Sequence, residues 1–506
     1  MKGTQRMDIG LKSRDGAPLS AASESSSHQR KRRIKLPSLR MRVSERKILL
    51  FAIDLLLVNL ALIGGRALGL RLFAPDVPQA WLPKWSITLS LLWPLVAIFF
   101  DSYNLARAAS FFYSVRSITA AALATILIYA LIPVLTPPLL SRGVIFFFAG
   151  LAATGLAGWR FIYARLFEQP WFTQRALVVG AGNAGQALAD ALATHPDDAN
   201  PFRGTGYQLV GFVDDDPLCH HQEIAGVPVL AGHEQLVYLA QRLEVDEIVL
   251  AITHRHAISQ DLFDALLRCR EMGFRVIIMS VLYERLLGRV PVEHIGRDLQ
   301  MVVPMEASAA ERFYRLIKRV SDIIIAGLGL VALALIVPIV AAVNALTSPG
   351  PLFYRQRRVG YGGRPFEMLK FRSMIPDAEK ESGAVWACEN DDRITPLGRL
   401  LRHTRLDEVP QIINVLKGEM SIIGPRPERP EFVEQLAREL PFYRARHAVR
   451  PGITGWAQVQ YDYGDCVEDA KIKLEYDLYY VKNMSLWLDL RILLQTVPVM
   501  LQLRGQ

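Results

Sequence analysis

The chain has 506 residues, of which 51% are hydrophobic and 21% are charged. This mixture excludes a pure channel and an ordinary soluble enzyme, and it indicates membrane segments joined to globular domains of ~100–200 residues each. The formal net charge of +9 suits anionic lipid or phosphate, whereas no nucleic-acid-binding motif accompanies it. The four cysteines lack paired spacing, which argues against a zinc site and a disulfide framework.

Residues 1–45 are polar, rich in serine and basic, with a cluster of cations at 30–33. We expect a disordered cytosolic tail. The apolar run after it is too long for the central region of a cleavable signal peptide. The basic cluster fits either a nucleic-acid patch or a topology signal, and its position directly before an apolar run favours the topology signal.

Four apolar stretches follow the tail, and each is long enough to cross a bilayer core, which needs ~20 residues. They are residues 47–73, 82–103, 115–135 and 142–166. The arginines of the connections gather on one side, so we expect four transmembrane helices over residues 46–167 and globular domains on the cytosolic face. We predict an anchor and no transport, because no acid–base pair is evident inside the spans: Asp54 and Arg66 lie near the ends of the first run.

A Rossmann-like domain is predicted over residues 171–300. A buried strand at 175–180 leads into the turn Gly180-Ala-Gly-Asn-Ala-Gly185 and then into a helix at 186–194. Glycines in this setting admit a pyrophosphate close to a helix N-terminus. Further strands at 207–213, 247–252 and 274–279, with helices between them such as 259–272, predict a parallel sheet.

The candidate ligands of this domain are Gly180, Gly182, Gly185 and Asp214. Asp214 follows the second strand, in the place of a ribose-binding acid, although its spacing from the glycines exceeds the usual ~20 residues. A nucleotide or NAD is one interpretation. The other is a structural domain that keeps the turn without a ligand, and the residues leave both open.

A further apolar run at 323–346 is also long enough to cross the bilayer. Both of its flanks are strongly basic, and a crossing would leave one basic cluster outside. Pro338 removes a backbone donor in mid-helix and kinks the helix. We therefore expect a re-entrant membrane helix over residues 311–347; the alternative is a fifth, kinked span. Tyr314 and Lys318 have dehydrogenase-like spacing, which we interpret as coincidence beside a membrane segment.

The last part of the chain, residues 348–506, combines acids with cations that suit a diphosphate. The cations are Lys370, Arg372, Arg402 and Arg426. The adjacent acids Asp407 and Glu408 offer one nucleophile and one Mg²⁺ ligand. Their spacing alone favours helix capping, because Pro410 follows in what resembles a first helical turn.

Many segments of this region occur in the order found in one enzyme family. They include Lys318-Arg-Val-Ser-Asp322, Phe353-Tyr-Arg-Gln-Arg-Arg-Val-Gly360, Lys370-Phe-Arg-Ser-Met374, Leu406-Asp-Glu-Val-Pro-Gln411, Asn414-Val-Leu-Lys-Gly418, Gly424-Pro-Arg-Pro427 and Pro451-Gly-Ile-Thr-Gly-Trp-Ala-Gln458. Over residues 310–503 the chain resembles the bacterial sugar transferases, which are monotopic polyprenyl-phosphate phosphoglycosyl transferases. The four apolar stretches and the Rossmann-like region are similar to the long members that prime exopolysaccharide or O-antigen synthesis.

The resemblance implies transfer of a sugar 1-phosphate, from UDP-glucose or UDP-galactose, to undecaprenyl phosphate with release of UMP. Asp407 matches the nucleophile that forms a covalent phosphosugar intermediate, and Glu408 matches its Mg²⁺-binding partner. The four cations match positions near the phosphates or the nucleotide. Asp477 matches a further acid, which we expect to be a substrate-binding residue together with these cations. The helix break is Val337-Pro338 here, where shorter members often have Ser-Pro.

The expected fold therefore joins a four-helix membrane anchor, an α/β Rossmann-like domain and a mainly α-helical catalytic domain with C-terminal interfacial helices. The expected partners are UDP-sugar, undecaprenyl phosphate and lipids of the bacterial inner membrane, and a homo-oligomer is left open. One alternative is a membrane-bound NAD-dependent nucleotide-sugar dehydratase or epimerase. Another is a non-catalytic subunit of polysaccharide assembly. No residue identifies the sugar.

Overall fold

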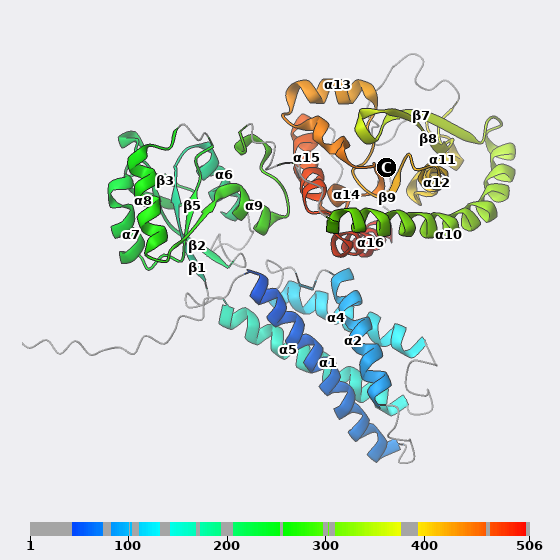
Figure 1. Cartoon of the computed structure of the whole chain (residues 1–506). Coiled ribbons are helices and arrows are strands. Elements are labelled where there is room, and N and C mark those ends of the chain that lie inside the picture. The colour runs from blue at the N-terminus through cyan, green and yellow to red at the C-terminus, as the bar shows by residue number, and fades with distance from the viewer. Residues whose placement is uncertain are drawn as a thin grey trace, which may run out of the picture. The chain divides into compact units, whose positions relative to one another are not determined.

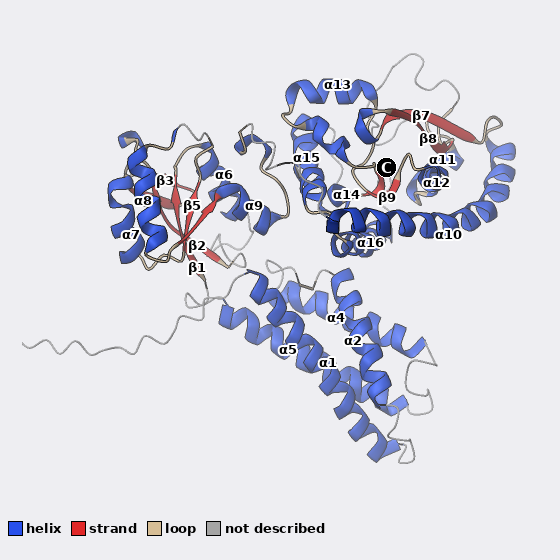
Figure 2. Cartoon of the chain, viewed as in Figure 1, coloured by secondary structure: helices blue, strands red, loops and turns tan. Residues whose placement is uncertain are grey.

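The computed structural model describes residues 43–73, 82–100, 102–103, 111–131, 142–167, 173–193, 206–253, 257–296, 302, 309–375, 393–461 and 466–501. Nearly all of the predicted tail over residues 1–45 lies outside them. The described elements form an N-terminal helical bundle, an α/β domain and a C-terminal domain of helices and short strands (Figures 1 and 2). Each is described below by itself.

The described part of the bundle contains four helices, which overlap the four predicted apolar stretches. They are α1 (Val43–Phe73), α2 (Leu82–Phe99), α4 (Phe111–Leu131) and α5 (Arg142–Phe167). Trp93, Leu89 and Leu62 are among the side chains buried between them. Within the described residues, α1 is long and apolar enough to cross a membrane over Glu45–Gly65, and α2 and α4 contain shorter apolar segments.

One prediction about this bundle is wrong, because an acid–base pair does lie inside it. Arg160 of α5 donates a hydrogen bond to Asp54 of α1 at 2.5 Å, and both side chains are fully buried. The two residues are 106 positions apart, so no local sequence pattern reveals the pair. Each charge is costly to bury alone, which makes the pair a specific link between α1 and α5.

The α/β domain contains a six-stranded sheet in the order β3-β4-β2-β1-β5-β6. Four strands lie where the sequence predicts them and run parallel: β1 (Gln174–Val179), β2 (Tyr207–Val213), β5 (Glu247–Leu250) and β6 (Arg275–Ile278). The sequence analysis missed β4 (Val227–Ala231), which is parallel to β2, and β3 (Glu223–Ile224), which is antiparallel to β4. The predicted parallel sheet is confirmed.

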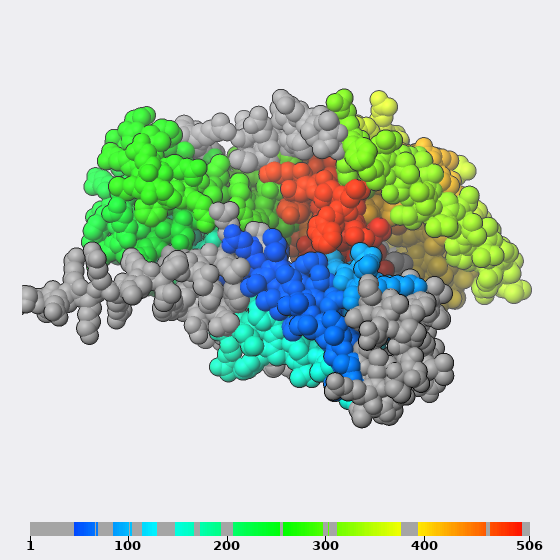
Figure 3. All heavy atoms as spheres, turned by 60° about the horizontal axis from the view of Figure 1, so that its bottom comes forward, coloured from blue at the N-terminus to red at the C-terminus, as the bar shows by residue number. Residues whose placement is uncertain are grey.

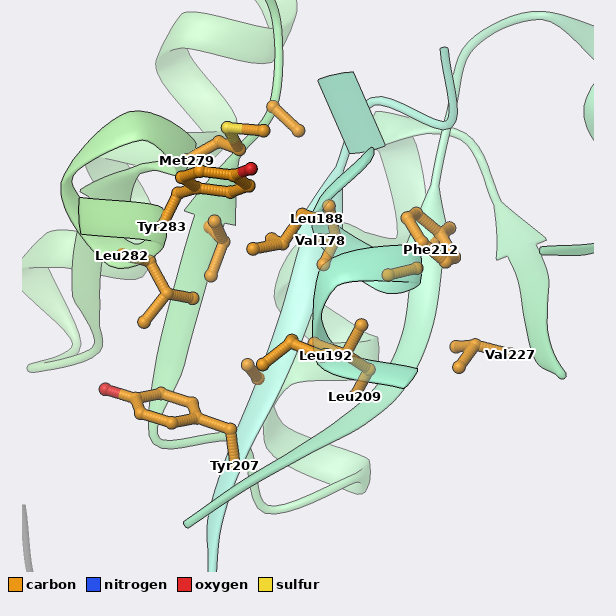
Figure 4. Packing of buried hydrophobic residues seen from close by; sticks show 14 of the residues in the cluster. Val178, Leu188, Leu192, Tyr207, Leu209, Phe212, Val227, Met279, Leu282 and Tyr283 are labelled. Atoms are coloured by element: carbon orange, nitrogen blue, oxygen red, sulfur yellow. The ribbon is translucent and has the colours of Figure 1, made fainter. Parts of the chain in front are cut away.

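Helices cover both faces of this sheet. They are α6 (Asn183–Ala193), α7 (Leu236–Arg242), α8 (Gln260–Glu271) and α9 (Met279–Leu287). Val178 of β1 packs with Leu188 of α6 and Leu282 of α9 (Figure 4), whereas its neighbour Val179 packs with the layer that contains α7 and α8. A strand buried on both faces needs apolar side chains at successive positions, which explains the continuous apolar run of β1.

The C-terminal domain starts with α10 (Ala309–Thr347), a 39-residue helix that contains Pro338. Its other helices are α11 (Pro396–His403), α12 (Ile412–Lys417), α13 (Pro430–Glu439), α14 (Trp456–Gln460), α15 (Val467–Lys482) and α16 (Leu486–Leu501). The prediction of a mainly helical domain is right, but it omitted the strands. These are the antiparallel hairpin of β7 (Phe353–Val359) and β8 (Pro365–Phe371), and the parallel pair of β9 (Ser421–Ile423) and β10 (Gly452–Thr454).

The first half of α10 is fixed to the C-terminal domain by polar contacts. Arg319 donates to the carbonyls of Val415 and Leu416 at the end of α12, at 2.8 and 3.0 Å. Asp322 is buried and accepts from the Ser421 hydroxyl and the Ile422 amide, both at 3.0 Å. A cation at a helix C-terminus satisfies carbonyls that have no partner inside the helix.

The second half of α10 returns to the same domain, since the helix bends (Figure 1). Leu333 and Val340 pack with Phe371 of β8 and Leu401 of α11. The opposite face is apolar and exposed, and it lies at the surface of the domain (yellow-green in Figure 3); the Leu335 side chain, for example, is 69% exposed. By length and hydropathy α10 is the second described helix able to cross a membrane, over Glu311–Thr347.

The C-terminal helix α16 has one packed face and one exposed face. Leu488 and Ile492 are buried in a cluster with Met420 of the loop before β9, whereas Trp487 is exposed. The sequence predicts interfacial helices at this end of the chain. The packed contacts account for one face, and the exposed tryptophan suits an interface.

Candidate active site

The adjacent acids lie at the start of a short 3-10 helix, η9 (Leu406–Gln411), which continues directly into α12. Arg405 precedes this helix with a left-handed backbone, φ 55°. This conformation costs a non-glycine residue about 1–2 kcal/mol, and here it turns the chain from α11 into η9. Asp407 and Glu408 occupy the first turn and Pro410 follows inside the helix, so a helix does start here. The predicted capping role of the acids is wrong, because Arg405 is the N-cap residue and no side chain caps this helix by a hydrogen bond.

Asn414 of α12 holds strand β8 beside η9. Its side-chain oxygen accepts from the Leu369 amide at 3.0 Å, and its amide nitrogen donates to the Glu367 carbonyl at 2.7 Å. The side chain is buried, so these bonds replace contacts with water. They place Lys370, the next residue of the strand, with its Nζ 3.7 Å from Oε1 of Glu408.

Glu408 is held as an anion by two cations. Arg426 Nη2 donates to Oε1 of Glu408 at 2.9 Å, and Lys370 approaches the same oxygen. Burial alone would raise the pKa of Glu408, but the attraction of Arg426 and Lys370 outweighs burial and lowers it to about 2. Glu408 is therefore ionised at any physiological pH.

Asp407 differs from its neighbour although it belongs to the same turn. It is only 8% exposed. Burial, followed by repulsion from Glu408, raises its pKa, against the opposing effects of Lys370, Arg402 and Arg426. A poorly solvated carboxylate with a raised pKa is more basic, and so a better nucleophile, than a solvated one. The turn thus combines one fixed anion with one more reactive carboxylate.

Lys370 and Arg402 complete the group around the acids. Burial lowers the pKa of Lys370 to about 8, although Glu408 opposes the shift. Arg402, near the end of α11, donates from Nε to the Ser373 hydroxyl at 2.9 Å, and its charge lowers the pKa of Asp407. The structure therefore brings together Lys370, Arg402, Arg426 and the two acids.

Arg372 makes its hydrogen bonds at the end of α10. It donates from Nη2 to the Asn344 side-chain oxygen at 2.9 Å and to the Ser348 carbonyl, both beside the end of α10. Gly350 packs directly against it, since a Cβ on Gly350 would lie 2.4 Å from Nη1. Its observed role is to fix the exit of α10, although the sequence predicts it as a substrate-binding residue.

Asp477 is linked to Glu408 through two arginines, Arg446 and Arg426. It is buried in α15 and accepts from Arg446 Nη2 at 2.7 Å, and the same nitrogen donates to the backbone carbonyl of Arg426 at 2.8 Å. Burial raises the pKa of Asp477 to about 6, against the attraction of Arg446. Sequence reasoning missed Arg446 as well as Arg358, which donates to the Pro427 carbonyl at 3.0 Å. Arg358 lies in a basic run that could have pointed to it, whereas Arg446 had no such signal.

Asp407 and Glu408 could supply a small part of the ligands that Mg²⁺ needs. Carboxylate oxygens are the ligands it prefers, and it keeps few protein ligands beside water and phosphate oxygens. The repulsion between Asp407 and Glu408 would also be relieved by a cation. Among the described residues no group of three or more histidine, cysteine or acidic side chains could hold a metal. Glu408, with Asp407 beside it, is therefore the candidate ligand.

The glycine-rich turn of the α/β domain has the expected local geometry. Gly180 has φ 105°, which favours glycine, and a Cβ on Gly185 would lie 2.2 Å from the Gly180 carbonyl oxygen. A Cβ on Gly182 would meet nothing within 4 Å, so open space lies there. Asp214 accepts from the Ala181 amide at 2.6 Å. The turn and Asp214 thus come together, and Asp214 already binds one amide of the turn.

Comparison with known proteins identifies two sequence families. The profile of the family described as bacterial sugar transferase matches residues 313–503, which include most of α10 and the acids. The profile described as CoA-binding domain matches residues 98–279, which include the six strands of the sheet.

Three relatives are similar over most of the chain. A protein of Aeromonas hydrophila named UDP-N-acetylgalactosamine-undecaprenyl-phosphate N-acetylgalactosaminephosphotransferase is 38% identical over 59% of this chain and 68% of its own length. Two proteins named UDP-glucose:undecaprenyl-phosphate glucose-1-phosphate transferase are each 34% identical over 64% of this chain. The one from Xanthomonas campestris pv. campestris is matched over 66% of its length and the one from Escherichia coli (strain K12) over 67%.

The order of motifs, the geometry around Asp407 and Glu408 and these matches agree. The chain belongs to the bacterial sugar transferase family, among its long-form members of the priming type.

Proposed function

We propose that this protein transfers a sugar 1-phosphate from a UDP-sugar to undecaprenyl phosphate, releasing UMP, as the first step of exopolysaccharide or O-antigen synthesis. The observation that carries the proposal is the contrast between the two adjacent acids. Asp407 is a buried carboxylate with a raised pKa, whereas two cations hold Glu408 as an anion. The names of the three relatives support the same reaction.

The reaction proceeds in two displacements. A carboxylate oxygen of Asp407 attacks the β-phosphorus of the UDP-sugar, and the bond from that phosphorus to the bridging oxygen breaks, so that UMP leaves. An oxygen of undecaprenyl phosphate then attacks the phosphorus of the aspartyl-phosphosugar, which regenerates the Asp407 carboxylate. The raised pKa of Asp407 supports its role as nucleophile.

The cations bind and orient the donor. Arg426 and Lys370 surround Glu408, where guanidinium and ammonium groups would hold diphosphate oxygens in line for attack. Mg²⁺, held by Glu408 with Asp407 beside it, would neutralise charge on the phosphates when bound. Arg402 acts on the Asp407 side of the turn, as its effect on the pKa of that residue indicates.

The membrane arrangement that suits this reaction is a four-span anchor, α1, α2, α4 and α5, with α10 as a re-entrant helix in the inner membrane and the globular domains in the cytosol. Two observations support the re-entrant path. Both halves of α10 pack on one folded domain, through Asp322 and through Val340, and its opposite face is exposed and apolar. A straight crossing would separate the two halves by the bilayer.

The donor sugar is a hexose or an N-acetylhexosamine, since the relatives are named for glucose and N-acetylgalactosamine. Glucose and galactose are the sugars we expect. The test is UMP release by the purified protein with undecaprenyl phosphate and each of a panel of UDP-sugars. Release from one UDP-sugar, with loss in Asp407→Asn, supports the proposal; no release from any, or undiminished release by the variant, refutes it.

The dehydratase alternative would need Tyr314 and Lys318 as its catalytic acid–base pair, and both side chains have another role. The Tyr314 hydroxyl donates to Asp489 at 2.8 Å and Lys318 lies 3.0 Å from the same carboxylate, which commits both residues to a buried contact with α16. The non-catalytic alternative predicts that Asp407→Asn still supports polymer production in cells. We expect no polymer from that variant.

We also propose that the glycine-rich turn of the α/β domain binds a nucleotide-containing ligand such as NAD or CoA. The open space at Gly182 supports this, and it also provides a selective test. Gly182→Ala leaves the fold undisturbed, so loss of thermal stabilisation by NAD or CoA in this variant alone would reveal the site. If neither ligand raises the melting temperature of the unmodified protein, the domain is structural.

A further inference from the structure

The segment that carries Arg426 is held in an unusual way. Pro425 and Pro427 have no amide hydrogen, so the backbone of these two residues can be fixed by hydrogen bonds only through its carbonyls. All three carbonyls have donors: the Gly452 amide donates to Pro425 at 2.9 Å, Arg446 to Arg426 at 2.8 Å and Arg358 to Pro427 at 3.0 Å. Two of the three donors are arginine side chains, and the segment therefore depends on where those side chains are held.

Arg446 is itself held by Asp477. The Arg446 side chain is almost fully buried, and its other bonds go to the Tyr443 hydroxyl and to Asp477 Oδ2, both at 2.7 Å. A buried guanidinium needs a counter-charge, and Asp477 provides it. Asp477 is 2% exposed, so a UDP-sugar has no access to its carboxylate.

We propose that Asp477 and Arg446 are positioning residues, which hold Arg426 against Glu408 and so set the place of the donor diphosphate. This rests on the proposed transfer from a UDP-sugar. It also changes the role of Asp477, which acts through Arg446 and Arg426 and does not contact substrate.

Removing the Asp477 charge has a defined consequence. Arg446 would be left as a buried cation, would turn toward other acceptors and would release the Arg426 carbonyl. Arg426 would then move relative to Glu408. A displacement of about 1 Å in a group that orients a substrate lowers activity by about 100-fold. We expect Asp477→Asn to lower kcat/KM for the UDP-sugar by this factor, and Asp477→Glu to recover part of it.

The decisive experiment is a double-mutant cycle on UMP release. If Asp477 acts through Arg426, Asp477→Asn loses its effect in an Arg426→Ala background, where it should change kcat/KM by less than about threefold. Asp489→Asn is the matched control. It removes another buried carboxylate of the same domain, one that binds Tyr314, Lys318 and Tyr480, and its effect should add to that of Arg426→Ala.

The outcomes separate this inference from the proposed function. If the unmodified protein releases UMP but Asp477→Asn costs the same factor with and without Arg426, the inference is overturned while the function stands. If the unmodified protein releases no UMP from any UDP-sugar, both fall. Should Asp477→Asn fail to fold, Tyr443→Phe replaces it in the cycle. That variant removes a single hydrogen bond to Arg446, and its smaller effect must also vanish in the Arg426→Ala background.

Discussion

Arg426 Nη2 lies 2.9 Å from Oε1 of Glu408, the residue that directly follows Asp407. Side chains that are adjacent in a 3-10 helix point about 120° apart, because the helix has ~3 residues per turn. Glu408 therefore meets Arg426 and Lys370, whereas Asp407 makes no ion pair with them within 4 Å among the contacts of the described residues. Two neighbouring carboxylates thereby acquire opposite pKa shifts.

Asp407→Asn should stabilise the protein while it abolishes activity. A carboxyl group whose pKa is raised by folding destabilises the folded state at any pH above that pKa, and asparagine removes this penalty. We expect a higher melting temperature at pH 7.5 (a condition chosen to lie about three units above the ordinary aspartate pKa) and UMP release reduced by about 1,000-fold or more. Calorimetry and a single-turnover assay measure the two effects. A less stable variant would contradict the interpretation that the ionised Asp407 side chain destabilises the folded state.

For Glu408 we expect the opposite effect of ionisation on stability. Its pKa falls from 4.5 to about 2 on folding, so its contribution to stability is complete above 4.5 and is lost as the pH falls toward 2. The melting temperature of the unmodified protein should decline across this window, and Glu408→Gln should flatten that part of the curve. An unchanged slope in the variant would show that other acids account for it.

Deprotonation of Lys370 should weaken binding of the UDP-sugar at alkaline pH. Burial lowers its pKa to about 8, so the free enzyme loses this cation as the pH rises through that value. We expect kcat/KM for the UDP-sugar to fall above pH 8. Lys370→Arg keeps the charge and should move the alkaline limb upward, since the arginine pKa is above ~12. A limb that stays in place in this variant would assign it to another group.

Arg372→Ala distinguishes the two roles considered for Arg372. Its bonds to Asn344 and Ser348 predict a loss of stability of about 2–4 kcal/mol, because buried acceptors lose a charged donor. The KM for the UDP-sugar should stay within about twofold, as expected for a residue that makes no substrate contact. Lys370→Ala serves as the contrasting control, with a raised KM. A large KM increase in Arg372→Ala, without loss of stability, would restore the substrate-binding role.

The buried pair in the bundle makes a further prediction. Asp54→Asn leaves Arg160 as an unpaired buried cation, which should destabilise the bundle by about 3–5 kcal/mol. Asp54→Leu combined with Arg160→Met replaces the pair with apolar side chains of similar size and should recover most of the loss. Melting in detergent, followed by the fluorescence of Trp93 and Trp159, measures both. A double variant as unstable as the single one would mean that the pair does more than balance charge.

Much of the fold could be predicted because its signals are local. The strands β1, β2, β5 and β6 are apolar runs with turn residues at their ends, and four apolar stretches match four helices. Strand β3 was missed because a two-residue strand carries almost no pattern, and β4 because it contains Pro228, which weakens a strand prediction. The hairpin of β7 and β8 was missed because its strands carry charged residues, as at Arg355 and Glu367, and most side chains of β7 are exposed.

The candidate site divides in the same way. Residue chemistry pointed to Asp407, Glu408, Lys370, Arg402 and Arg426 as acids and cations that suit a diphosphate, and the family resemblance suggested their roles. The sequence determined which residue types are available and that acids and cations share one domain. Tertiary structure decided how they pair: Asn414 brings β8 to η9, Arg372 turns to α10 and Asp477 reaches Arg426 only through Arg446. Such pairings depend on burial and on contacts between residues 20 to 106 positions apart, and those contacts leave no periodic trace in the chain.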